Sequence, residues 1–252
     1  MLYFVNITKE EFLQRKLLYK HLSLENALKC LETKTLWFSN PTNWKDPFER
    51  RFIDARYYRG GEKTTFTWVG KIYCSCFSQT ASSEAFWQTY SNNTLCVEFR
   101  ISREKLLELL TDLKDYDVYI GKAEYMLTSD IVKPHLSDIP FNPPLDSRHP
   151  TMTAARLFLL KRVAFKYEDE IRVILIDKRK SDKNGVGIEY KMDATELIKQ
   201  ILLDPSVDDY TYLMISKVLE ESYGFRRSEN GLRRVMKSSL YSKPEIATIY
   251  ID

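Results

Sequence analysis

The chain has 252 residues and a formal net charge of +3, with 44% hydrophobic and 29% charged residues. A chain of this size and composition can bury a core without disulfides or metals, and we expect one domain over residues 1–252. The nearly balanced charge excludes a strong electrostatic drive toward duplex nucleic acid, and a count of only 8 glycines disfavours a glycine-rich phosphate loop.

Residues 1–12 carry charges too early for a signal peptide, and no apolar run approaches the roughly 18 residues of a membrane-spanning helix. Cys30, Cys74, Cys76 and Cys96 form no Cys-x-x-Cys pair, and the histidines are scattered. We therefore expect a cytoplasmic protein with free thiols, no membrane association and no metal ion.

In the first half of the chain, stretches rich in β-branched and aromatic residues alternate with leucines at helical spacing. Ser23 is a typical helix N-cap. We predict strands at residues 17–21, 35–39, 71–78, 94–100 and 118–126, and helices at residues 23–32, 83–90 and 102–113. Residues 40–49 contain two prolines and two asparagines, which predict turns and no regular element.

The second half opens with residues 128–150, where five prolines predict a long loop. Asp193 and Glu196 have the spacing of a capping box. We predict helices at 151–163 and 208–221, and strands at 170–177, 187–191, 201–204, 234–236 and 246–251, the first two of these strands paired with each other. This irregular alternation predicts an α+β fold with a mixed, mostly antiparallel central sheet and flanking helices.

The most informative candidate site lies in residues 165–176. If the strand extends back to Lys166, then Lys166, Glu168, Glu170 and Arg172 line one face, which becomes apolar further along. Arg172 would then hold Glu170 at the floor of a cleft, because a buried carboxylate needs a partner. The alternative is a solvated edge strand with cross-strand ion pairs.

A second candidate site is residues 36–49. Its functional interpretation is a loop that presents Asn40, Asp46 and Glu49 to a ligand, with Asp46 extended because it precedes a proline. The alternative is a structural loop closed by asparagine turns and plugged by aromatic side chains such as Phe48.

A third candidate site combines the end of the strand at 71–78 with the helix after it. Trp87 and Tyr90 share a helix face and can stack on a flat ligand. The alternative is that both side chains pack in the core.

Three blocks of sequence occur in a recognisable order. They are Tyr19-Lys20, Ser23–Leu28, Leu36–Pro41 and Asp46–Glu49; then Cys76–Ser78, Trp87, Tyr90 and Cys96–Phe99; and last Lys166–Arg172. Over residues 18–204 the chain resembles the bacterial domain-of-unknown-function family twenty-nine seventy-one (DUF2971). The blocks at 46–49 and 168–172 are the most specific, and Lys45 stands where the family usually has Asn.

The family resemblance implies no settled activity, although some members resemble parts of phage-defence or toxin systems. At a weaker level the layout is similar to DNA-modifying, toxin-type ADP-ribosyltransferases, which implies an ADP-ribosyltransferase-like fold and NAD as substrate. Lys20 or His21 would then contact NAD. Trp87 or Tyr90 would flank the nicotinamide, and Glu170 would orient the nucleophile and stabilise an oxocarbenium-like transition state.

Three functions stay open. The first is an NAD-consuming ADP-ribosyltransferase or glycohydrolase with Glu170 central, in which Glu170→Gln leaves the fold intact and abolishes turnover. The second is a non-catalytic module for a nucleotide-like ligand or a partner protein, with a modest nucleic-acid patch as a further alternative. The third is a metal-dependent nuclease or phosphodiesterase that uses Asp46, Glu98, Glu168 and Glu170.

The candidate residues fall into two groups, and the oligomeric state stays open. The catalytic candidates are Glu170, Glu168 and Arg172. The ligand-binding candidates are Lys20, His21, Ser39, Asn40, Asp46, Phe48, Glu49, Phe77, Ser78, Trp87, Tyr90 and Lys166.

Overall fold

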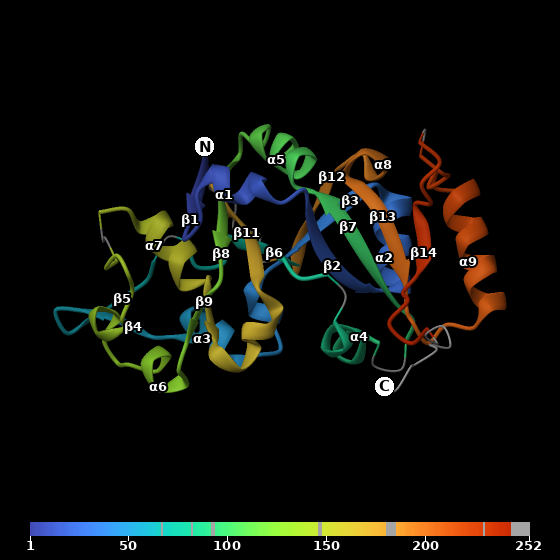
Figure 1. Ribbon diagram of the computed structural model, residues 1–252. Coiled ribbons are helices and arrows are strands. Elements are labelled where there is room, and N and C mark those ends of the chain that lie inside the picture. Colours follow the sequence, from blue (N-terminus) through green and yellow to red (C-terminus); the bar gives the residue numbers. More distant parts are fainter. Residues whose placement is uncertain are drawn as a thin grey trace, which may run out of the picture.

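The computed structural model describes residues 1–66, 68–81, 83–91, 94–145, 148–179, 185–228 and 230–242. A ten-stranded sheet runs across it (Figure 1). Eight strands follow in the order β1 (Leu2–Val5), β8 (Tyr116–Lys122), β11 (Glu170–Asp177), β6 (Ile72–Ser78), β2 (Leu17–Ser23), β7 (Cys96–Ser102), β13 (Ile198–Leu203) and β14 (Val235–Lys237). β3 (Thr35–Ser39) pairs with β6 and with β12 (Gly187–Lys191).

Two small sheets accompany the large one. They are β9 (Glu124–Met126) with β10 (Leu160–Arg162), and β4 (Tyr57–Arg59) with β5 (Glu62–Thr64). Among the described strands, β1–β8, β13–β14 and β9–β10 pair in parallel, and the other pairs are antiparallel. The predicted α+β fold with a mixed, mostly antiparallel sheet is therefore confirmed.

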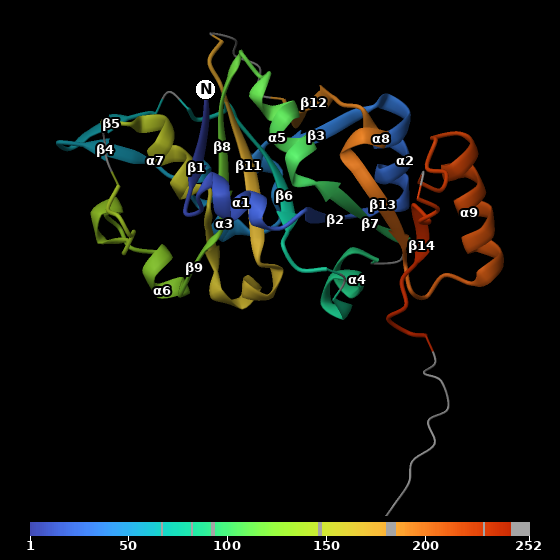
Figure 2. The same ribbon diagram turned by 45° about the horizontal axis from the view of Figure 1, so that its top comes forward.

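The helices contribute buried side chains to two main cores. The larger core takes side chains from α1 (Lys9–Gln14), α2 (Leu24–Thr33), α5 (Arg103–Thr111), α8 (Ala194–Leu197) and α9 (Asp209–Glu221). The second core takes them from α3 (Pro47–Asp54), α6 (Thr128–Ile131) and α7 (Pro150–Leu157). Figure 2 shows α9 beside β14 at one edge of the sheet, and α7 near β1 toward the other.

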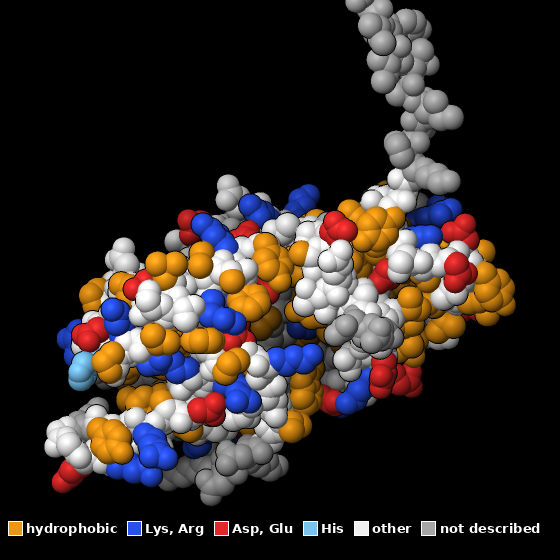
Figure 3. Space-filling model, turned by 90° about the horizontal axis from the view of Figure 1, so that it is seen from below, with side chains coloured by type: hydrophobic (Ala, Val, Ile, Leu, Met, Phe, Trp, Pro, Cys, Tyr) orange, Lys and Arg blue, Asp and Glu red, His pale blue; other side chains and the backbone are white. Residues whose placement is uncertain are grey.

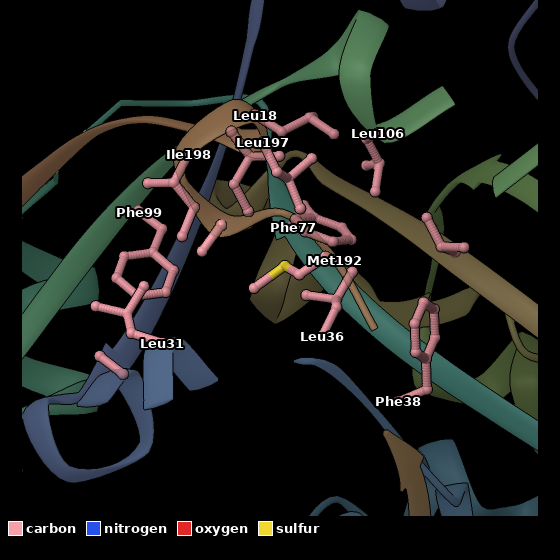
Figure 4. Close-up of a cluster of buried hydrophobic side chains, with 14 of the residues drawn as sticks. Leu18, Leu31, Leu36, Phe38, Phe77, Phe99, Leu106, Met192, Leu197 and Ile198 are labelled. Carbon is pink, nitrogen blue, oxygen red and sulfur yellow. The ribbon is translucent and has the colours of Figure 1, made fainter. Parts of the chain in front are cut away.

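The larger core gathers apolar side chains from one face of the central strands. Figure 4 shows Leu18 of β2, Phe77 of β6 and Phe99 of β7 in this cluster, together with Leu36 of β3 and Ile198 of β13. Burial of this apolar surface is the main favourable contribution to folding.

β11 divides its side chains between the two cores, as strand alternation requires. Ile171 and Val173 join the larger core, whereas Ile174 and Ile176 join the second core. By the same alternation Arg172 lies on the face of Ile174 and Ile176, and it is fully buried. The predicted change from charged to apolar along one face is confirmed within β11, from Glu170 and Arg172 to Ile174 and Ile176, whereas Lys166 and Glu168 lie outside the strand.

Most of the predicted elements are confirmed. β2, β3, β6, β7, β11, β13 and β14 correspond to predicted strands, and α2, α4 (Glu84–Tyr90), α5 and α9 correspond to predicted helices. Ser23 caps α2 and Asp193 caps α8 through hydrogen bonds from backbone N–H groups. The strand predicted at 246–251 lies outside the described residues.

The absence of regular structure in residues 40–49 was a wrong prediction. The segment contains the short helix η1 (Pro41–Asn43) and the start of α3. Asp46 is extended, as expected before proline, and caps α3 through a hydrogen bond from the N–H of Phe48. Pro47 occupies the first turn, where its missing N–H is not needed. The loop predicted at 128–150 is likewise interrupted by α6 and η2 (Leu136–Asp138).

The helix predicted at 151–163 is wrong in its second half, because α7 ends at Leu157 and β10 follows. The strand predicted at 118–126 breaks at Ala123, whose N–H donates to the carbonyl oxygen of Glu170. The next N–H, of Glu124, donates to the carbonyl oxygen of Leu159. The chain therefore leaves the large sheet at Ala123 and enters the β9–β10 pair.

The predicted pairing between residues 170–177 and 187–191 is also wrong, because β12 pairs with β3. β11 already has β6 on one side and β8 on the other, so neither of its edges is open. The edge-strand interpretation of β11 is wrong for the same reason. β1 and α1 have no predicted counterpart, although Thr8 and Glu11 form a capping box that begins α1.

Candidate functional site

A buried ion pair at the start of β11 is the centre of the candidate site. The Nε and Nη2 atoms of Arg172 donate to the two carboxylate oxygens of Glu170, both at 2.9 Å. Arg172 also donates to the carbonyl oxygen of Phe158 at 2.7 Å and to Glu49 at 3.0 Å. Its guanidinium lies 4.7 Å from the centre of the Trp44 ring. Arg172 is 0% exposed and Glu170 is 3% exposed, so this bidentate pair is enclosed by protein.

Lys161 joins this ion pair to the surrounding segments. Its Nζ lies 2.9 Å from Glu170, 2.6 Å from Glu168 and 3.3 Å from Glu49. Lys161 belongs to β10, Glu49 to α3, and Glu168 to the end of the short helix η3 (Val163–Glu168). We call Glu49, Lys161, Glu168, Glu170 and Arg172 the buried charge cluster.

A sharp turn before β11 brings Glu168 and Glu170 together. The strand does not extend back to Lys166 as predicted, because the chain forms η3 and Asp169 adopts a positive φ of 39°. Lys166 is consequently exposed on η3, outside the cluster. The hydroxyl of Ser78 donates to the carbonyl oxygen of Glu168 at 2.7 Å. This contact holds the turn, and both carboxylates lie within ion-pair distance of Lys161.

The charges of the cluster do not balance, since three carboxylates face two cations. Burial alone would raise the pKa of Glu170, but the charges of Arg172 and Lys161 lower it below its ordinary value. Burial opposes the charge of Lys161, yet Glu170 raises the pKa of Lys161 above its usual range. Burial raises the pKa of Glu168, and the charge of Lys161 offsets only part of that effect. Glu168 is therefore the least compensated carboxylate.

A second ion pair lies beside the cluster. Arg162, next to Lys161, places Nη2 3.1 Å from Asp46 and its guanidinium 4.4 Å from the centre of the Phe48 ring. Asp46 and Phe48 both belong to the segment that leads to Glu49. The structure therefore brings the block at 46–49 together with Glu168, Glu170 and Arg172, which are far from it in the sequence.

A cavity of about 180 Å³ adjoins the cluster between η3 and α4. We call it the acidic aromatic cavity; its lining includes Tyr19, Lys20, His21, Cys76, Phe77, Ser78, Phe86, Tyr90, Glu168 and Glu170. Figure 3 views the face that carries η3 and α4, where hydrophobic and charged side chains surround a hollow near the middle of the molecule. Pockets for whole drug-sized ligands span roughly 300–1,000 Å³, so this cavity fits a single ring.

Stacked rings form one wall of the cavity. The ring of His21 stacks on Phe86 with centroids 4.6 Å apart and lies 5.8 Å from the ring of Tyr90. Trp87 meets His21 edge-on at 5.2 Å and is only 2% exposed, whereas Tyr90 is 43% exposed. Of the two aromatic residues singled out in the sequence, Tyr90 is placed to touch a ligand, and Trp87 supports the wall from inside.

Lys20 and Phe77 point largely to the other face of the sheet. Nζ of Lys20 donates to the hydroxyl of Ser75 at 3.1 Å and to the carbonyl oxygen of Cys76 at 3.0 Å, and it lies 4.9 Å from the centre of the Phe77 ring. Phe77 belongs to the larger core. Within the described part of the chain Lys20 forms no ion pair with Glu170, so these two residues do not meet as a catalytic pair.

Ser39 and Asn40 hold the loop that carries Trp44. The indole N–H of Trp44 donates to the hydroxyl of Ser39 at 3.0 Å, and that hydroxyl donates to the carbonyl oxygen of Cys74 at 3.3 Å. The side-chain oxygen of Asn40 accepts from the N–H of Thr42 at 3.0 Å, as expected for an asparagine turn. Both residues thus act on the site through Trp44, which covers Arg172.

Three residues of the site, Cys76, Tyr125 and Lys161, are not among the candidates predicted from the sequence. Lys161 was assigned to a helix, and no local pattern marks it because its partners come from α3, η3 and β11. The thiol of Cys76 hydrogen-bonds to Glu170, and burial raises the pKa of this thiol well above its ordinary value. The hydroxyl of Tyr125 accepts from the N–H of Glu170 at 2.9 Å.

Glu98 lies apart from the other carboxylates proposed for metal binding. It belongs to β7, with β2 and β6 between it and β11, and it lies 3.3 Å from His21 and 3.0 Å from Arg100. Over the described ranges, no group of three or more His, Cys, Asp or Glu side chains is arranged to hold a metal ion. No helix in those ranges is long and apolar enough to cross a membrane.

No protein-family model, no curated protein and no solved structure matches this chain. The geometry alone therefore defines the class of site: a small acidic cavity with aromatic walls, built on a buried charge cluster in an α+β sheet.

Proposed function

We propose that this chain binds the nicotinamide end of NAD in the acidic aromatic cavity and cleaves NAD there, as a glycohydrolase or ADP-ribosyltransferase. The observation that carries the proposal is that two carboxylates, Glu168 and Glu170, and the stacked rings of His21, Phe86 and Tyr90 border one cavity. Such a cavity suits a flat ring that bears a positive charge.

The size and charge of the cavity support this ligand. A single nicotinamide ring fits the cavity, and the rest of the dinucleotide would extend outside it. The excess negative charge of the cluster favours a cationic ring over a neutral one. When the bond between nicotinamide and C1′ of the ribose breaks, its electron pair leaves with nicotinamide and positive charge develops on the ribose. Nearby carboxylates stabilise that charge.

The geometry supports different roles for the two glutamates. Glu170 has its carboxylate engaged by Arg172 and Lys161, so it acts as a positioning residue. Among the described residues Glu168 has only Lys161 as an ion-pair partner, and its raised pKa suits a group that accepts a proton. We assign to Glu168 the proton released when water or an acceptor adds to C1′. This differs from the sequence-based hypothesis, in which Glu170 was central.

The test is release of nicotinamide from NAD by the purified chain, with Glu168→Gln and Glu62→Gln compared. Glu62 is an exposed residue of β5 and serves as the matched control. We expect release by the wild type and the control, and a loss of about a hundredfold or more in Glu168→Gln. Circular dichroism should show that both variants are folded. Full activity in Glu168→Gln would refute its assigned role.

A second candidate function is a non-catalytic module that binds the same ligand. The observation that favours it is the complete set of partners around Glu170, which fits a structural role. In that case NAD raises the melting temperature without nicotinamide release. If NAD causes neither release nor a thermal shift, both forms of the proposal fail. A catalytic outcome would agree with the defence or toxin role that the family resemblance implies.

A further inference from the structure

A larger cavity lies on the other face of the sheet and shares two lining residues, Lys20 and Leu22, with the acidic aromatic cavity. Its volume is about 470 Å³, within the roughly 300–1,000 Å³ of small-molecule sites. Most of its lining is apolar and includes Leu22, Leu36, Phe99, Ile101, Met192 and Ile198. We call it the apolar cavity.

One cationic side chain, that of Lys20, reaches this cavity from β2. Its Nζ donates to two neutral acceptors, the hydroxyl of Ser75 and the carbonyl oxygen of Cys76, which leaves one of its three N–H donors for another partner. No carboxylate of the described residues lies within ion-pair distance of Lys20. Burial lowers the pKa of Lys20, and the charge of Glu170 offsets only part of that effect.

The other charges at the cavity compensate each other. Lys29 of α2 lies 3.5 Å from Glu189 of β12, and its Nζ lies 6.0 Å from the centre of the Trp37 ring. The thiol of Cys30 donates to the carbonyl oxygen of Thr35 at 2.9 Å. Among the described residues, Lys20 is therefore the charged side chain at this cavity that has no ion-pair partner. A ligand that enters this apolar space gains most if it brings a negative charge to that position.

We propose that the apolar cavity is a second binding site, for a small monocarboxylic acid with an apolar body, whose carboxylate pairs with Lys20. The apolar body replaces water along the leucine, isoleucine and phenylalanine side chains. The carboxylate accepts the remaining N–H of Lys20 and supplies its missing counter-ion. A neutral apolar molecule makes the apolar contacts but does not pair with Lys20. An amine places a second positive charge beside that of Lys20.

The proposal is tested by titration calorimetry of the full chain with three probes of equal chain length: sodium octanoate, 1-octanol and octylammonium chloride. We expect octanoate to bind at least about tenfold more tightly than 1-octanol, and octylammonium to bind most weakly, because a hydrogen bond to a charged group in a protein gives a preference of this order. The comparison needs no variant. Equal affinities for octanoate and 1-octanol, or no binding of octanoate, would overturn the proposal.

Three variants locate the interaction. Lys20→Met should bind octanoate and 1-octanol equally, whereas Lys20→Arg keeps the charge and should retain the preference. Lys29→Met removes an exposed lysine at the same cavity and serves as the matched control, with the preference unchanged. If Lys29→Met rather than Lys20→Met abolishes the preference, the carboxylate binds at the rim and the assignment to Lys20 is wrong.

Discussion

Glu170 and Arg172 lie two residues apart on one strand, and their side chains form a two-point ion pair inside the sheet, with both contacts at 2.9 Å. Alternation along β11 places them on the same face, and burial makes each depend on the other. Glu49 of α3 and Lys161 of β10 contact this pair directly, and Glu168 of η3 is joined to it through Lys161.

Loss of one charge from this pair should destabilise the fold. We expect Glu170→Gln to lower the free energy of unfolding by about 3–5 kcal/mol, because Arg172 is left buried without its main partner. Urea unfolding measures this change, with the exposed Glu62→Gln as control. The pKa of Glu170 is lowered in the folded state, so its contribution is complete above about pH 4.3, the ordinary carboxyl value, and is lost as the pH falls through the folded value. If the difference in unfolding free energy between the wild type and Glu170→Gln does not shrink at low pH, the ion-pair explanation is contradicted.

Removal of Lys161 should make stability depend on pH in the opposite direction. In Lys161→Met the three carboxylates of the cluster share only Arg172, so the pKa of Glu168, already raised, should rise further. A carboxyl whose folded pKa is raised destabilises the fold above that value and ceases to do so when it is protonated. We therefore expect a lower melting temperature near pH 8 and a partial recovery at a lower, mildly acidic pH. The exposed Lys63→Met, in β5, is the control, and a variant equally unstable at both pH values would count against the charge argument.

Asp46 has two roles that substitutions can separate. Its side chain caps α3 through the N–H of Phe48 and forms an ion pair with Arg162. Asp46→Asn keeps a capping oxygen and loses the ion pair, and it should cost less than about 1 kcal/mol because Arg162 is partly exposed. Asp46→Ala loses both interactions and should cost about 1 kcal/mol more. Equal stabilities of the two variants in urea unfolding would show that the cap contributes nothing.

Gly187 should not tolerate a larger residue. A Cβ atom there would lie 2.5 Å from the carbonyl oxygen of Phe38 and 2.3 Å from the Trp37 ring. The backbone contact cannot be relieved by a rotamer change, so Gly187→Ala should cost about 1–3 kcal/mol and loosen the β3–β12 pair. Gly61→Ala meets no atom within 4 Å but has a φ of +84°; it should show only the smaller cost of that backbone conformation. Amide hydrogen exchange in β12 distinguishes local loosening from a global loss of stability.

The fold class and most elements could be predicted because the signals are local. A helix cap such as Ser23 and the alternation in β11 depend only on residues that are close in the sequence. The same alternation predicts that Glu170 and Arg172 lie on one face. The metal-site hypothesis also grouped Asp46 with Glu168 and Glu170, and the structure brings the block at 46–49 beside them, although Glu98 lies elsewhere.

What could not be predicted depends on contacts between distant segments. Lys161 was placed in a helix because the leucines before it fit helical spacing, yet the segment pairs with β9 and meets carboxylates from three other elements. The partner of β12 was mistaken because a hairpin is the nearest option, whereas β6 and β8 already occupy both sides of β11. The alternation of side chains along β2 predicts that Lys20 lies on the same face of the sheet as Leu18 and Leu22.

The order of strands in the large sheet has a consequence for the rate of folding. β1 pairs with β8, β2 with β7, and β6 with β11, so hydrogen-bonded neighbours come from distant parts of the chain. Each such pairing requires closure of a long loop before its contacts are gained, and domains dominated by non-local pairs fold slowly. During synthesis β2 and β6 emerge well before β7 and β11, and their apolar faces stay uncovered in the interval. The chain should therefore depend on protection from aggregation while it folds.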